Sequence, residues 1–78
     1  MVNIEMALVY LSLALTSESE KEVKKSVENA IVELELAIEF TTSEIACISL
    51  ADIITALLQG DDIDLIINEL ELIQSELI

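Results

Sequence analysis

The sequence predicts an all-α protein, a small antiparallel bundle of four helices that forms a single domain over residues 1–78. Apolar residues recur at spacings of three and four along most of the chain, which is the period of an amphipathic α-helix. The chain contains no proline and only one glycine, so little in it interrupts a helix. Short polar breaks divide the pattern into four segments, and short connections make successive helices antiparallel neighbours.

The first expected helix, residues 2–15, is apolar on nearly every side. One face carries Ile4, Leu8, Leu11 and Leu15, and a second face carries Met6, Val9, Tyr10 and Leu13. A helix that is apolar all round is buried on most sides. We therefore expect either the central helix of a small core or an interface with another chain.

The second expected helix, residues 18–40, has the most regular amphipathic pattern. Its apolar stripe consists of Val23, Val27, Ala30, Ile31, Leu34, Ala37 and Ile38. A flanking row, which we expect to widen the buried arc, consists of Val32, Leu36 and Phe40. Ser17 and Ser19 each have a glutamate three residues later, which matches the capping box that begins a helix, and the pattern does not choose between them.

The third expected helix, residues 43–59, has two apolar rows of similar length. One row is Ile45, Ile48, Ala51, Ile54 and Leu58, and the other is Cys47, Leu50, Ile53 and Leu57. Thr41, followed three residues later by Glu44, is the expected N-terminal cap of this helix. Gly60 follows the helix where a left-handed C-terminal cap is needed.

The last expected helix, residues 62–77, begins after a pair of aspartates. Asp61 or Asp62 is expected to cap it, because a carboxylate suits the positive N-terminal end of a helix. Its buried face is expected to consist of Ile63, Ile66, Ile67, Leu70, Ile73 and Leu77.

The composition predicts self-association. Hydrophobic residues make up 54% of the chain, and its mean hydropathy is +0.65. A chain of this length buries only about 60% of its unfolded surface when it folds alone, so it cannot hide this much apolar surface easily. We expect a homodimer or a higher oligomer, or a permanent protein partner.

The charge is strongly negative and narrows the choice of partners. Sixteen carboxylates and three lysines give a net charge of −13. A field of that sign repels phosphate backbones and anionic lipids, so we expect no direct contact with nucleic acid and no membrane binding. The longest uncharged run, residues 6–17, has 12 residues, whereas a membrane span needs about 20. The single cysteine forms no internal disulfide, which favours the cytoplasm.

The residues that usually carry enzymatic chemistry are scarce. The absence of histidine removes imidazole bases and ligands, and Cys47 is expected to be a small apolar residue of a helix. Asp61, Asp62 and Asp64 resemble the start of a calcium loop, but helix capping accounts for them. Paired carboxylates on the second and fourth helices would converge only if those helices pack together. We therefore expect no catalytic residue, no metal, no cofactor and no enzymatic activity.

Two functions fit these features. The first is an acidic protein-binding module, for example an inhibitor or regulator of phage or mobile-element type that occupies a basic surface of a nucleic-acid-handling protein. Its candidate acidic surface consists of Glu28, Glu35, Glu39, Asp64 and Glu71. A simpler explanation of the acidity is that it keeps an apolar chain soluble.

The alternative is a structural or assembly subunit that self-associates through the apolar faces of the first and third helices. Its candidate interface consists of Met6, Val9, Tyr10, Leu13, Cys47, Leu50, Ile53 and Leu57. Salt separates the two functions, because carboxylate-led binding weakens as salt rises whereas apolar assembly persists.

Overall fold

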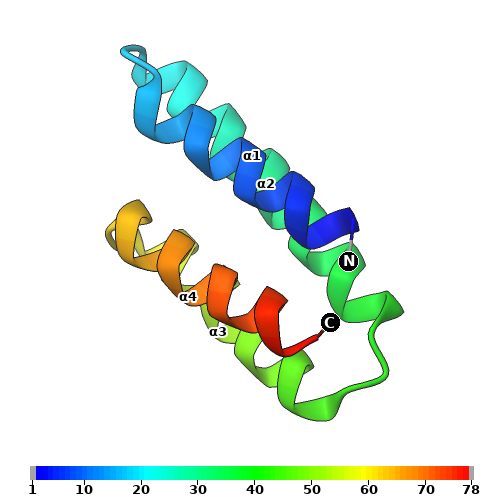
Figure 1. The fold of residues 1–78 in the computed structure, drawn as a ribbon. Helices are drawn as coiled ribbons and strands as arrows, with labels where there is room; N and C mark the ends of the chain where they lie inside the picture. The colour runs from blue at the N-terminus through cyan, green and yellow to red at the C-terminus, as the bar shows by residue number, and fades with distance from the viewer. Residues whose placement is uncertain (1, 78) are drawn as a thin grey trace.

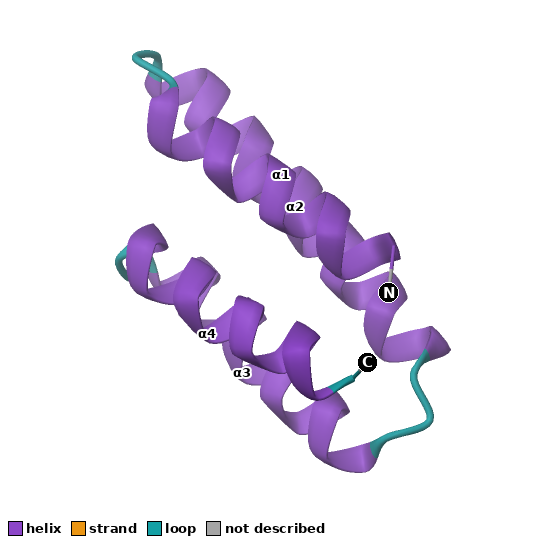
Figure 2. Ribbon diagram, in the orientation of Figure 1, coloured by secondary structure: helices purple, strands orange, loops and turns teal. Residues whose placement is uncertain are grey.

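Four α-helices make up the fold in a computed structural model that describes residues 2–77 (Figures 1 and 2). No strand occurs among the residues described. Three-residue loops join the helices, and the predicted helix ends lie within two residues of the observed ones. The all-α, four-helix prediction is confirmed. The helices are α1 (Val2–Thr16), α2 (Glu20–Phe40), α3 (Glu44–Gln59) and α4 (Ile63–Glu76).

The helices form two antiparallel hairpins, α1–α2 and α3–α4, that pack against each other (Figure 1). Helix α1 contacts α2 and α4, and α3 also contacts α2 and α4. Within the part of the chain that the structure describes, α1 does not contact α3 and α2 does not contact α4. Each helix therefore occupies a corner of the bundle, with two neighbours on its inner sides and solvent on its outer side.

The N-terminal caps differ between α2 and α3. Ser19 is the N-cap of α2, but its side chain makes no capping hydrogen bond. Ser17 Oγ instead donates to a carboxylate oxygen of Glu22 at 3.0 Å. In α3 the cap is Ser43, whose Oγ accepts from the backbone N–H of Ala46 at 3.2 Å. The prediction of Thr41 as this cap is wrong, because Thr41 Oγ1 accepts from the Ser43 N–H and fixes the loop before the helix.

The turn between α3 and α4 is confirmed in its main features. Gly60 has φ +79° and ψ +26°, the left-handed conformation that ends many helices. Its N–H donates to the carbonyl of Leu57 at 3.2 Å, and the Asp61 N–H donates to that of Ala56 at 3.1 Å. Of the two candidate aspartates, Asp62 caps α4, because its Oδ1 accepts from the N–H two residues later at 3.0 Å.

The core lies between the two hairpins and is entirely apolar in residues 2–77. Its largest fully buried side chains are Ile4, Leu11, Leu34, Leu50, Ile53 and Leu70. Helix α1 makes its most extensive contact with α2. Four buried alanines permit the two backbones to approach closely, and they are spaced seven residues apart on each helix: Ala7, Ala14, Ala30 and Ala37.

The flanking row of α2 does not widen the core. Val32 and Phe40 are 55% and 67% exposed, and Leu36 is half-buried. The expectation that this row is buried is therefore wrong. The reason is that α1 and α3 cover only the two inner sides of α2, so the row that continues around the helix faces solvent.

Two leucines of α4 provide a matched test of the core. Leu70 is fully buried and Leu72 is 67% exposed. We expect Leu70→Ala to lower the free energy of unfolding by about 2–5 kcal/mol, because it leaves a cavity. Leu72→Ala should change it by about 0.5 kcal/mol or less. Urea denaturation followed by circular dichroism measures both free energies of unfolding. Equal losses of stability in the two variants would contradict the burial of Leu70 in the core.

Gly60 provides a test of the turn. A Cβ at this position meets nothing within 4 Å, so a larger residue is penalised only by the left-handed backbone. We expect Gly60→Ala to lower the free energy of unfolding by about 1–2 kcal/mol. Gly60→Asn should cost less, because asparagine tolerates this conformation better. The same denaturation experiment checks both variants. An alanine variant as stable as the asparagine variant would argue against a left-handed conformation at residue 60.

Candidate protein-binding surfaces

Large apolar side chains are unusually abundant on the surface. Twelve of them are exposed among residues 2–77. Single exposed apolar residues need no explanation, but contiguous apolar patches on small proteins mark interaction sites. Many of the twelve fall on two faces of the bundle, one on each hairpin.

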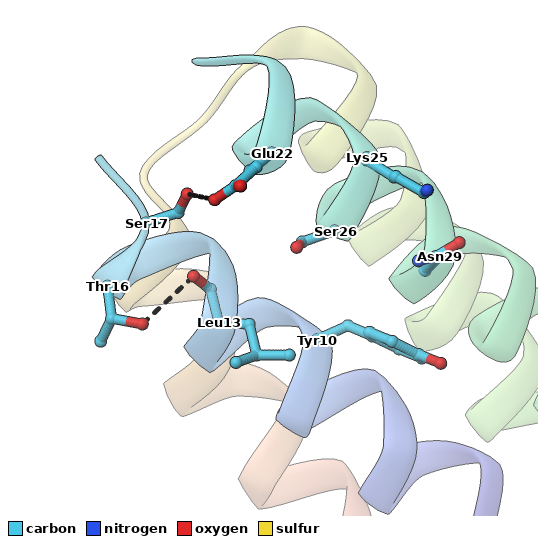
Figure 3. Close-up of a pocket in the computed structure, with 8 residues that line it drawn as sticks. All are labelled: Tyr10, Leu13, Thr16, Ser17, Glu22, Lys25, Ser26 and Asn29. Carbon is cyan, nitrogen blue, oxygen red and sulfur yellow. Dashed lines mark hydrogen bonds between the residues drawn. The ribbon is translucent and has the colours of Figure 1, made fainter. Parts of the chain in front are cut away.

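The first surface, called here the outer α1–α2 face, follows the solvent side of the first hairpin. On α1 its exposed residues are separated by four, three and four positions, so they form one line. The depression beside this line is lined by Tyr10 and Leu13 of α1 together with Lys25 and Asn29 of α2 (Figure 3). The residues that define the face are Val2, Met6, Val9 and Leu13 of α1 with Val32, Leu36 and Phe40 of α2.

The second surface, called here the α3–α4 groove, runs between the helices of the second hairpin. Its apolar lining includes the exposed Leu72 and Ile45 and the half-buried Ile73. Three exposed carboxylates line the same groove. The residues that define the groove are Ile45, Ser49, Asp52, Glu69, Leu72, Ile73 and Glu76.

Charge is divided unevenly between the two hairpins. All three lysines lie near the start of α2, at Lys21, Lys24 and Lys25. Residues 41–78 contain eight carboxylates and no lysine. Helix α1 has a single charged residue, Glu5. The second hairpin therefore carries the stronger negative field, and the outer side of α1 carries the weakest.

The five predicted acidic residues are all exposed, but they do not form one surface. Glu28, Glu35 and Glu39 lie on α2, whereas Asp64 and Glu71 lie on α4. Because α2 and α4 occupy diagonal corners, the two rows are separate. The same arrangement keeps the carboxylates of α2 away from those of α4, so carboxylates from these two helices do not come together in one site.

The predicted apolar interface is divided between surface and core. Met6, Val9 and Leu13 are exposed and Tyr10 is half-buried, so this part lies at the surface. Cys47 is half-buried, and its Sγ donates to the carbonyl oxygen of Ile38 at 3.6 Å. The remaining three residues are buried between the hairpins and are not available to another chain: Leu50, Ile53 and Leu57.

The reason for this correction is the orientation of α3. Its two apolar rows are similar in length, and periodicity does not say which one meets the neighbouring helices. The row of Leu50 faces the core, so part of the other row is left outside, where Ile45, Ile48 and Leu58 are 65–74% exposed. Sequence reasoning also missed Leu65 and Leu72 on α4, although their seven-residue spacing places them on one helix face.

The carboxylates create a surface field rather than a buried reactive group. Glu33 is half-buried, and the other fifteen aspartate and glutamate side chains are exposed. Within residues 2–77 no group of three or more histidine, cysteine, aspartate or glutamate residues is arranged to hold a metal ion. Asp62, one of the three aspartates considered for calcium, is engaged as the cap of α4.

None of the described helices is both long enough and apolar enough to cross a membrane. No family model, curated protein or solved structure matches the chain.

Proposed function

We propose that the protein is a non-enzymatic binding module that holds a basic, amphipathic segment of a partner protein in the α3–α4 groove. The observation that carries this proposal is that exposed apolar side chains and three carboxylates line the same groove, on a hairpin without a single lysine. An amphipathic helix with apolar residues on one side and lysine or arginine at its edges matches this pattern.

The two parts of the groove make different contributions. Leu72 is 67% exposed and Ile45 is 74% exposed, so a partner that covers them removes much apolar surface from water. Burying such a side chain fully contributes about 1.5–3 kcal/mol. Asp52, Glu69 and Glu76 attract a basic partner, speed its association and disfavour acidic competitors.

The negative charge of the groove indicates which class of protein it binds. A cluster of carboxylates on a helical scaffold resembles a run of phosphates, so surfaces that evolved to bind nucleic acid are attracted to it. We propose a nucleic-acid-handling protein of the cytoplasm as the partner, with this chain as its inhibitor or regulator. The groove supplies apolar contacts as well, which distinguishes such a regulator from a chain that is acidic only for solubility.

Assembly is a second candidate function, and a different observation favours it. The outer α1–α2 face exposes four large apolar residues in one line on a helix with a single charge. Such a face suits a structural subunit that associates with copies of itself.

Two variants of equal charge test the groove. The groove variant combines Asp52→Asn, Glu69→Gln and Glu76→Gln, and the control combines Glu28→Gln, Glu35→Gln and Glu39→Gln. Each removes three exposed carboxylates. Each protein is immobilised and used to capture partners from a nuclease-treated lysate of the native host at low salt. We expect the groove variant to retain roughly a tenth or less of the captured nucleic-acid-handling protein, and the control nearly all of it.

Salt and the control decide the interpretation. Raising the salt from about 0.1 M to 1 M shortens electrostatic screening from about 10 Å to about 3 Å, so the captured protein should elute. Equal losses in both variants would mean that net charge alone attracts the partner, and would contradict the groove. Capture that salt and both variants leave unchanged would contradict carboxylate-led binding altogether.

A further inference from the structure

We propose that two copies of this chain pair through the outer α1–α2 face, with their α1 helices antiparallel about a two-fold axis. This surface lies on the other hairpin from the α3–α4 groove, and the pairing does not depend on what the groove binds. Three features support a second copy as the occupant: the spacing of the exposed residues, the distribution of charge and the area of the face.

The spacing on α1 is self-complementary. Four of its five exposed large apolar residues, all but Leu15, are separated by four, three and four positions, the spacing that lines up the contact residues of paired helices. This sequence of intervals reads the same from either end. An antiparallel copy centred between Met6 and Val9 therefore sets Val2 against the partner's Leu13 and Met6 against the partner's Val9. The symmetry is that of an isologous interface, in which the same patch serves both chains.

The charge distribution favours this face over the others. Two chains of net charge −13 repel each other, and the repulsion is smallest where carboxylates are fewest. Helix α1 offers Glu5 alone. A basic partner would find little here to recognise, because no cluster of carboxylates surrounds the line. A second copy presents an apolar face with few charges and the same spacing.

The charges at the two ends of the hairpin favour the antiparallel direction. The end with the loop between α1 and α2 carries all three lysines, which offset Glu18, Glu20 and Glu22 and leave this end close to neutral. The other end carries Glu5 and Glu39 and no lysine. An antiparallel pair places the lysine end of each copy against the lysine-free end of the other. A parallel pair would bring the two lysine-free, acidic ends together.

The area is sufficient for a dimer. The six exposed apolar side chains of the face are 37–70% exposed. Together they offer on the order of 500 Å² per copy, near the upper end of the patches that monomers leave open. Complete burial of these side chains in two copies would amount to roughly 1,000 Å² before any polar rim is counted, which meets the lower limit for a biological interface. Tyr10 and Asn29, beside the line, supply polar groups for that rim.

Sedimentation equilibrium at micromolar concentrations tests the pairing directly. We expect the native chain to sediment at twice its mass of 8.6 kDa, and to remain paired at high salt. Val9→Glu should weaken the dimer about a hundredfold or more, because it places two like charges in the interface. Ile48→Glu makes the same change at a residue that is 65% exposed on α3, and should leave the dimer intact. Circular dichroism checks that both variants keep their helices.

Cysteine crosslinking tests the direction, in a chain where Cys47→Ser removes the native thiol. Val2→Cys and Leu13→Cys are made as separate proteins and oxidised alone or mixed. In the antiparallel pair the two Leu13 positions lie about 16 Å apart along the helix axis, beyond the 7 Å or so that a disulfide spans. We therefore expect disulfide-linked dimers only in the mixture.

Each contrary result overturns a stated part of the proposal. A native monomer, or a dimer that Ile48→Glu disrupts and Val9→Glu does not, excludes pairing through the outer α1–α2 face. A trimer or larger assembly excludes the two-fold axis, and crosslinking of Leu13→Cys alone excludes the antiparallel direction. None of these outcomes affects partner capture by the groove, so a failure of the pairing and a failure of the proposed function are distinguishable.

Discussion

The surfaces of this protein depend on one geometric constraint: a helix at the corner of a four-helix bundle buries only the sides that meet its two neighbours. Helix α1 has apolar side chains on more sides than that. The side with Ala7 and Leu11 meets the core, so Val9 and Leu13 face solvent although they are equally apolar. The outer α1–α2 face is thus a consequence of putting an all-round apolar helix in a corner position, and no change of local packing would bury it in one chain.

The same constraint separates two kinds of surface. The first hairpin presents an apolar face with few charges, and the second presents a groove lined in part by carboxylates. The two hairpins form the two layers of the bundle (Figure 1), so a pair joined through the first hairpins would carry its two grooves on the second hairpins, away from the contact. Binding at a groove would then leave the pairing surface free, and the dimer would gain avidity for a partner with repeated basic segments.

Periodicity and turn chemistry predicted the four helices, and Gly60 and Asp62 act at the turn much as expected. What periodicity could not predict was which apolar row faces inward. On α3 the choice between the rows of Ile48 and Leu50 depends on which side of the helix packs against α2 and α4, which is a tertiary property. Alanine is only a partial guide to the inner side. The seven-residue alanine spacing marks the buried side of α1 and α2, where two backbones approach closely, but α3 exposes Ala51.

The negative charge also affects whether self-association stops at a dimer or continues to larger assemblies. A chain with two exposed apolar surfaces is at risk of open-ended assembly, in which the outer α1–α2 face of one copy binds the groove of the next. That contact would bury Asp52, Glu69 and Glu76 against a face that has one lysine, Lys25, beside its apolar line, and burying unpaired charges is costly. Pairing of the outer α1–α2 face with itself buries no such cluster. In the proposed pairing, the carboxylates of the groove would therefore favour a closed dimer over a filament, in addition to attracting the proposed basic partner.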